Sequence, residues 1–225
     1  MKKKLLLAGA AVLIVAGAGG YIALTGAANA EVRAALERYQ TNLKDDQSFA
    51  YTNVDVGLSG ATLTEVRHSW ELDSGPLTLE AAEVTVADPM TDETGKVTGF
   101  GSIAWKDAVL INGKGVQITT KDGSAADVIQ PQALRAGQLP MSALAFSGMT
   151  VTRSGEDRRI SIDSFEADGI TGYTLADARL QNLSVDQEKP LRVGGMTATA
   201  IDLTALSRLG PNPDPAQVIA TLSER

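Results

Sequence analysis

From Ser48 onward the apolar residues recur at every second position, and this pattern constrains the fold more than any other feature of the chain. A period of two predicts β-strands that are buried on one side, because successive side chains of a strand point to opposite faces of the sheet. The first long strand is expected over residues 62–72. One of its faces would carry Thr62, Thr64, Val66, His68, Trp70 and Leu72, and the other Leu63, Glu65, Arg67, Ser69 and Glu71.

Turn signals divide the following residues into further strands. The sequence Asn112-Gly113-Lys114-Gly115 lies between two short apolar runs and predicts a hairpin. A second turn is expected over residues 154–157, between strands near 149–152 and 159–162. The face alternation slips between Ile162 and Phe165, which predicts a bulge or a bend within that strand.

Helical patterns are few. Residues 31–43 predict an amphipathic helix, residues 121–139 one or two short helices within a connection, and residues 203–223 two short helices separated by prolines. The expected fold class is therefore mainly β: an antiparallel curved meander sheet or a sandwich, with a few short helices, preceded by one N-terminal transmembrane or signal helix.

The N-terminus carries Lys2, Lys3 and Lys4, followed by an uncharged run from Leu5 to Ala30. This run fits a single-pass anchor, because about 20 apolar residues span a bilayer, and it also fits a signal peptide cleaved after Ala30. Both interpretations keep the lysines in the cytoplasm and export the rest of the chain. The expected organisation is residues 1–30 as signal peptide or signal anchor, 31–47 as amphipathic helix and 48–225 as an exported β-rich domain.

Composition excludes several classes of function. The chain has 20 basic residues, three of them Lys2 to Lys4, and 27 acidic residues, so the exported part is strongly acidic. An acidic surface repels nucleic acid, and no nucleic-acid partner is expected. The chain contains no cysteine, which excludes disulfides, thiolate metal sites and cysteine nucleophiles.

Sequence motifs for catalysis are also missing. His68 is the one histidine, no Gly-x-Ser-x-Gly motif accompanies it, and we expect it to be packed within a strand face. Asp88, Asp92 and Glu93 lack the spacing of a calcium loop. We therefore expect no catalytic residues, no metal site and no cofactor, and the chain is not expected to be an enzyme.

The ratio of strands to helices raises the question of what covers the apolar sheet face. Eight to ten strands are expected, with three or four short helices to cover them. Either the sheet closes on itself, or part of the face stays open to an apolar ligand. The residues expected to line an apolar groove are Val66, Trp70, Leu77, Leu79, Val84 and Val86. The alternative is a closed β-sandwich that acts as a scaffold or adaptor for a protein partner in the cell envelope.

The arrangement of a basic start, a Gly-rich apolar segment, Thr25-Gly26, an amphipathic helix and a β-meander resembles the bacterial YdgA-like envelope proteins and, more distantly, AsmA-like proteins of the inner membrane. The resemblance rests on residues 5–39 and on the strands of residues 141–203. It implies a single inner-membrane anchor, a periplasmic domain with a curved sheet, and a role in envelope maintenance or lipid handling. The expected function is thus a non-catalytic, membrane-tethered periplasmic domain that binds lipid or another apolar envelope component.

Overall fold

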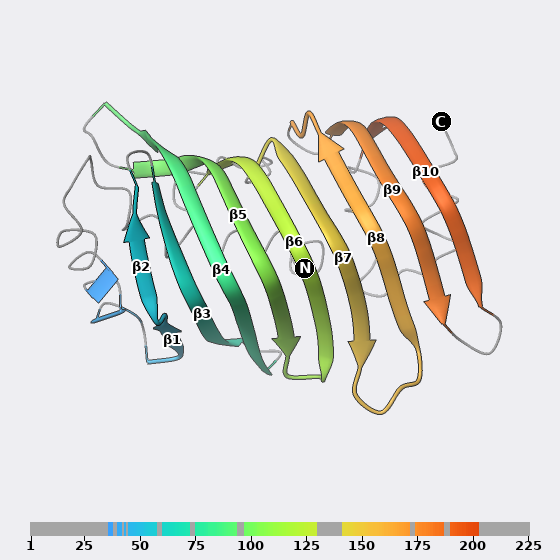
Figure 1. The fold of residues 1–225 in the computed structure, drawn as a ribbon, viewed down its shortest axis with the longest axis horizontal. Coiled ribbons are helices and arrows are strands. Elements are labelled where there is room, and N and C mark those ends of the chain that lie inside the picture. The colour runs from blue at the N-terminus through green and yellow to red at the C-terminus, as the bar shows by residue number, and fades with distance from the viewer. Residues whose placement is uncertain are drawn as a thin grey trace.

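One antiparallel sheet of ten strands makes up almost all of the described structure, a computed structural model (Figure 1). The described residues are 36–37, 40–41, 43, 45–57, 60–72, 75–93, 97–129, 141–171, 174–186 and 190–202. The strands are β1 (Gln47–Ala50), β2 (Asn53–Val56), β3 (Gly60–Leu72), β4 (Gly75–Thr91), β5 (Val97–Asn112), β6 (Val116–Ile129), β7 (Ala143–Arg153), β8 (Arg159–Asp168), β9 (Thr174–Asp186) and β10 (Leu191–Asp202). Within these residues, no helix is suited to span a membrane.

The strands from β3 to β10 follow one another in space as they do in the chain, each antiparallel to the next. The short strands β1 and β2 both pair with β3, at its two ends. The predicted mainly β, antiparallel sheet is confirmed. The described strands form one sheet and not the two of a sandwich, and the sheet is not closed, because its order runs from β1 to β10 without returning to β1. That open order contradicts the closed form of the alternative.

Apart from Gly75, Gly115 and Gly155 at strand ends and turns, the described residues with positive φ fall in two rows that cross the sheet. Between β3 and β4, Thr64 pairs with Glu83 and Val66 pairs with Ala81, but the register skips Glu65 and Ala82, which lie between them. Glu65, at this break in the pairing, has φ 50°. Similar breaks continue through every later strand at the same level. We call these positions the first bend row: Glu65, Ala82, Asp107, Lys121, Gly148, Asp163, Asn182 and Gly194.

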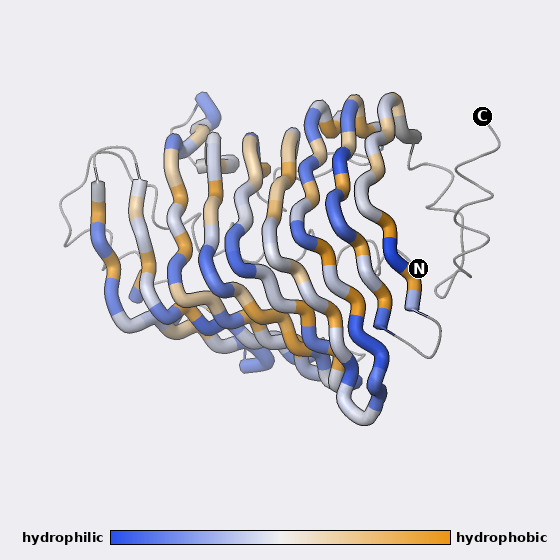
Figure 2. Tube along the Cα trace, turned by 45° about the vertical axis from the view of Figure 1, so that its right-hand side comes forward, coloured by the Kyte–Doolittle hydropathy of each residue, from blue (hydrophilic) through white to orange (hydrophobic). Residues whose placement is uncertain are grey.

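A second row lies six residues away from the first on or next to each strand from β4 to β10, and we call it the second bend row: Asp88, Gly101, Asp127, Ser142, Gly169, Ala176 and Ala200. In the first row, the residues with positive φ lie on or next to β3, β5, β7 and β9, and in the second row on or next to β4, β6, β8 and β10. Neighbouring strands therefore alternate in both rows. Figure 2 shows the result, with the strands turning together so that the sheet is curved.

Each bend exchanges the faces on which odd and even residues lie. Along β3, Ala61 and Leu63 are buried before Glu65, and Val66 and His68 are buried after it. The prediction that Thr62 and Thr64 share a face with Val66 is therefore wrong. The predicted slip between Ile162 and Phe165 is confirmed, because Asp163 of the first bend row lies between them.

Residues able to adopt a left-handed conformation occupy most of the positive-φ positions. They are chiefly Asp, Asn and Gly, the residues for which a left-handed backbone is least unfavourable in free energy. Side-chain hydrogen bonds reinforce the bends. The amide of Asn182 donates to Asp163 at 2.8 Å in the first row, and the Ser142 hydroxyl donates to Asp127 at 2.5 Å in the second.

Local turn chemistry forms the predicted hairpin between β5 and β6. The Gly115 amide donates to the Asn112 carbonyl at 3.0 Å, and the Asn112 side chain accepts from the amides of Lys114 and Val116. Gly115 has φ 72°, which the absence of a side chain permits. The predicted turn at Ser154-Gly155 also joins two strands, β7 and β8.

The helices expected from the sequence have different outcomes. Leu36, Glu37, Gln40 and Thr41 are helical, within the helix expected over residues 31–43. Residues 121–129 belong to β6, so the helix expected there is wrong: pairing with β5 on one side and β7 on the other overrides its Ala- and Asp-rich composition. Residues 130–140, the leader over residues 1–30 and the helices expected over residues 203–223 lie outside the described residues.

Candidate functional site

The six residues expected to line an apolar groove all lie on the same face of β3 and β4. Direct pairing sets Leu77 opposite Trp70 and Leu79 opposite His68. Five of the six are buried in the main hydrophobic cluster, and Trp70 packs against that cluster half-buried. Leu36 from the N-terminal helix and Phe49 from β1 belong to the same cluster. These residues therefore form the packed core at one end of the sheet.

The apolar face continues across the sheet, and its burial decreases toward β10. A single row of directly paired residues crosses the middle of every strand from β3 to β10: Leu63, Val84, Trp105, Gly123, Phe146, Phe165, Leu180 and Met196. Leu63 and Val84 are each 2% exposed, the four large side chains from Trp105 to Leu180 are half-buried, and Met196 is 56% exposed. One continuous surface is thus sealed at one end and accessible at the other.

We call the accessible part the open apolar patch: Leu144, Phe146, Phe165, Leu180, Leu191 and Met196. The rings of Phe146 and Phe165 stack with their centroids 5.0 Å apart. The next row on this face carries Ala167, Ala178 and Ala198 on β8, β9 and β10. These alanines extend the apolar face beside the larger side chains.

The bends bring apolar side chains of different sheet sections into contact. Buried residues from either side of both bend rows, such as Ala108, Ile103 and Phe100, belong to one hydrophobic cluster. We call the apolar face, whose buried residues form this cluster, the inner face of the curved sheet. Figure 2 shows hydrophobic positions on every strand of the curved sheet. An inner face of this kind can contact an elongated ligand from more than one side.

The outer face is polar and faces solvent. Hydroxyl pairs link neighbouring strands, including Thr119 with Thr150 at 2.6 Å and Ser161 with Ser184 at 2.7 Å. Cross-strand ion pairs add to them: Lys106–Glu83 at 2.8 Å, Arg67–Glu80 at 3.4 Å and Arg179–Glu166 at 3.9 Å. Exposed pairs of this kind contribute little to stability, but they keep the outer face hydrated.

His68 is part of the core. It is 2% exposed, and its ring lies between Phe49, with centroids 5.5 Å apart, and Trp70, with centroids 3.8 Å apart. Burial lowers the pKa of His68 from 6.5 to about 4, because the charged imidazolium loses its hydration. His68 is thus neutral at physiological pH and packs as an aromatic ring.

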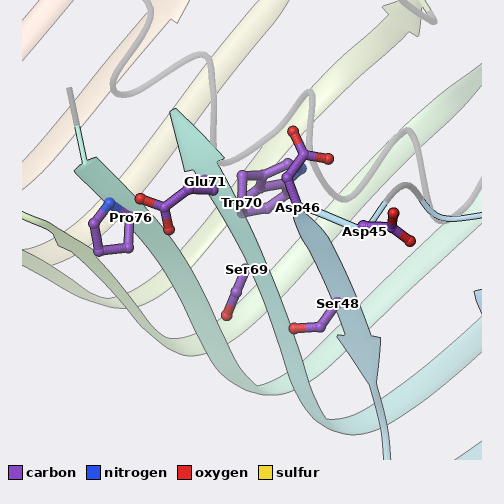
Figure 3. Close-up of a pocket in the computed structure, with 7 residues that line it drawn as sticks. All are labelled: Asp45, Asp46, Ser48, Ser69, Trp70, Glu71 and Pro76. Atoms are coloured by element: carbon purple, nitrogen blue, oxygen red, sulfur yellow. The ribbon is translucent and has the colours of Figure 1, made fainter. Parts of the chain in front are cut away.

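A shallow depression of about 490 Å³ lies where β1 and the end of β3 meet (Figure 3). It is lined by Asp45, Asp46, Ser48, Ser69, Trp70, Glu71 and Pro76. The Glu71 amide donates to the Asp46 carbonyl at 2.8 Å, which fixes the loop before β1. The rim of the depression is acidic and open to solvent, unlike the apolar inner face of the sheet.

Acidic and histidine side chains do not gather into a metal site within the part of the chain that the structure describes. Asp88 lies in the second bend row, and its role there is conformational, with φ 53°. Asp92 and Glu93 follow at the exposed end of β4.

Comparison of the chain with protein-family models and with curated proteins gave no match. The candidate site therefore rests on geometry alone. The groove was expected on β3 and β4, whose alternating apolar residues indicate one apolar face, and the structure places five of these six residues in the core. The open apolar patch was missed, although Phe146, Phe165, Leu180 and Met196 fall on the expected inner face once the shift of face at the first bend row is known.

Proposed function

We propose that this protein is a non-catalytic, membrane-tethered domain of the bacterial periplasm that binds a lipid or another apolar envelope component on the inner face of its sheet. The carrying observation is the decrease in burial along one row of paired residues, from Leu63 at 2% exposed to Met196 at 56% exposed. The open apolar patch is the binding surface. It differs from the six residues first expected, which the core already buries.

The leader supports the location. The uncharged run of residues 5–30 after three lysines would hold the domain at the inner membrane, or deliver it to the periplasm if cleaved after Ala30. A domain beside a bilayer meets acyl chains at high local concentration. Removing apolar surface from water contributes about 25 cal/mol per Å², so a patch spanning several strands can hold an acyl chain without any bond being made or broken.

Photocrosslinking with a phospholipid that carries a diazirine on one acyl chain tests this proposal on the full chain in detergent micelles. Mass spectrometry of the labelled protein should place the adducts on β7–β10, at open-patch residues such as Phe165, Leu180 and Met196. Adducts confined to the leader would overturn the proposal.

Matched variants separate specific binding from general stickiness. The double variant L180Q/M196Q places two amides on the open apolar patch. The control R179Q/T197Q changes the residue before Leu180 and the residue after Met196, which pair with each other on the outer face of the same strands. We expect the first variant to lose most of the labelling on β7–β10 and the second to retain it. Equal labelling of both variants would show that the inner face is not the binding surface.

A further inference from the structure

The two lateral edges of the sheet are built differently. At the first edge, β3 is covered by two four-residue strands, β1 and β2, with an interruption between them. At the other edge, β10 extends over twelve residues and pairs only with β9 among the described residues. A long edge strand exposes a row of backbone donors and acceptors that can pair with another strand.

The composition of β10 does not protect this edge. Proteins commonly block edge strands with lysine, proline or short length, and β10 contains neither lysine nor proline. Leu191 and Met196 on this strand are 51% and 56% exposed, and they are two of the three large apolar side chains exposed in the described structure. The edge thus has the properties of an interface for a further strand.

The bend rows define which strand fits. Positive φ alternates from strand to strand, and β10 has it at Ala200 in the second row and lacks it at Gly194 in the first. A strand that continues the sheet beside β10 must therefore have positive φ opposite Gly194 and a regular φ opposite Ala200. The two positions must be six residues apart and run in the opposite direction.

A second copy of β10 meets each of these requirements. In an antiparallel pair with a two-fold axis through Thr197, Gly194 faces Ala200 of the second copy, and Ala200 faces its Gly194. The alternation of φ then continues unbroken along both bend rows. We propose that two copies of this protein associate through β10, with Thr197 opposite Thr197, to form one continuous curved sheet.

The side chains agree with this register. The register places position 192 opposite position 202 of the second copy on both sides of the axis, and the sequence carries arginine at the first position and aspartate at the second, residues of opposite charge. On the inner face, exposed Met196 is placed opposite Ala198 of the second copy, and a large side chain meets a small one. The inner faces of the two copies would join into a single apolar surface. This proposal does not depend on lipid binding.

Cysteine substitution tests the register, because the chain has no cysteine of its own. T197C places two sulfur-bearing residues opposite each other, within the Cα separation of about 4.4–6.8 Å that a disulfide requires. T199C is the matched control on the same edge, since Thr199 faces Gly195 of the second copy and the two Thr199 residues are offset by four residues, about 13 Å. The double variant G195C/T199C restores an opposed pair.

The experiment is oxidation of the full chain in detergent micelles, followed by non-reducing electrophoresis. We expect about tenfold more cross-linked dimer for T197C and for G195C/T199C than for T199C. Cross-linking of T199C equal to that of T197C would overturn the register. A monomeric protein whose T197C variant does not cross-link would overturn the association itself, and would indicate that residues 203–225 or another partner covers β10.

Charge reversal provides an independent test by light scattering of the same preparations. R192D or D202R alone sets like charges opposite each other at both ends of the interface and should shift the protein toward monomer. The double variant R192D/D202R restores opposite charges and should recover the dimer. Failure of the double variant to recover it, with both single variants folded, would contradict the proposed register.

Discussion

The ring of Trp105 on β5 lies directly over Gly123 on β6. A Cβ atom at position 123 would approach Cε2 and Cζ2 of the indole to 2.1 Å, and the Nε1 of Trp105 donates a hydrogen bond to the Thr120 hydroxyl at 3.0 Å. Thr120 lies beyond the first bend row from Gly123, so the indole spans this bend on the inner face. Gly123 is needed because no side chain fits beneath the ring.

We expect G123A to displace Trp105 and to lower the free energy of unfolding by about 1–3 kcal/mol, the usual cost of overpacking. Chemical denaturation of the full chain measures the loss, and tryptophan fluorescence should shift as the indole leaves its site. The double variant W105L/G123A removes the clash and should recover part of the stability. A fully stable G123A with an unchanged spectrum would contradict the packing described.

Substitutions at Asp107 test the bend rows. Asp107 has φ 47°, a conformation that β-branched residues strongly disfavour. We expect D107V to cost about 1–3 kcal/mol of stability and D107G to be tolerated, because glycine adopts this conformation without strain. A104V, an exposed position on the same strand with an ordinary φ, is the control and should be near neutral. Equal effects of D107V and A104V would show that the bend does not require this backbone.

Acid should destabilise the protein through His68. Its pKa is lowered from 6.5 to about 4 in the folded chain, so the unfolded chain binds the additional proton between these values. The neutral His68 imidazole contributes its full stabilisation above pH 6.5. This contribution decreases as the pH falls and is lost below about pH 4, which lowers the free energy of unfolding by about 3 kcal/mol in total. Carboxylates titrate in part of this range, so the informative quantity is the difference from H68L. That difference should vary with pH between 6.5 and 4, and a constant difference would be evidence against a buried neutral imidazole.

The two ends of the apolar face should differ in their contribution to folding. Leu79 is 2% exposed in the core, and Leu180 is half-buried in the open apolar patch. We expect L79A to cost about 2–4 kcal/mol, since it leaves a cavity, and L180A to cost less than half as much. Urea denaturation of the two variants compares them directly. A larger loss for L180A would show that the patch is part of the core.

Much of the architecture follows from local sequence signals. Period-two alternation predicted the strands, and Asn112 with Gly115 predicted the hairpin, because both depend on residues close in sequence. The slip between Ile162 and Phe165 was recognised because large apolar residues stand on both sides of it. At Glu65 the same slip was missed: threonines precede it, and a glutamate gives no sign of a left-handed backbone.

Non-local pairing accounts for the remaining differences. Residues 121–139 are rich in alanine and glutamine, which predicts a helix in isolation, but residues 121–129 pair with β5 on one side and with β7 on the other. The position of the open apolar patch depends on where the N-terminal helix and β1 cover the sheet. Leu36 and Phe49 pack against the sheet at its β3 end. The periodicity of the sequence does not indicate against which end of the sheet these residues pack.

The two bend rows run straight across all the strands from β4 to β10, and each added strand extends both by one position. The number of strands and the curved cross-section of the sheet can therefore change independently in this architecture. Inserting or deleting a hairpin whose strands keep six residues between the two bend rows would lengthen or shorten the inner face of the sheet. The width and curvature of that face would stay the same. The length of the inner face is therefore set by the number of hairpins alone.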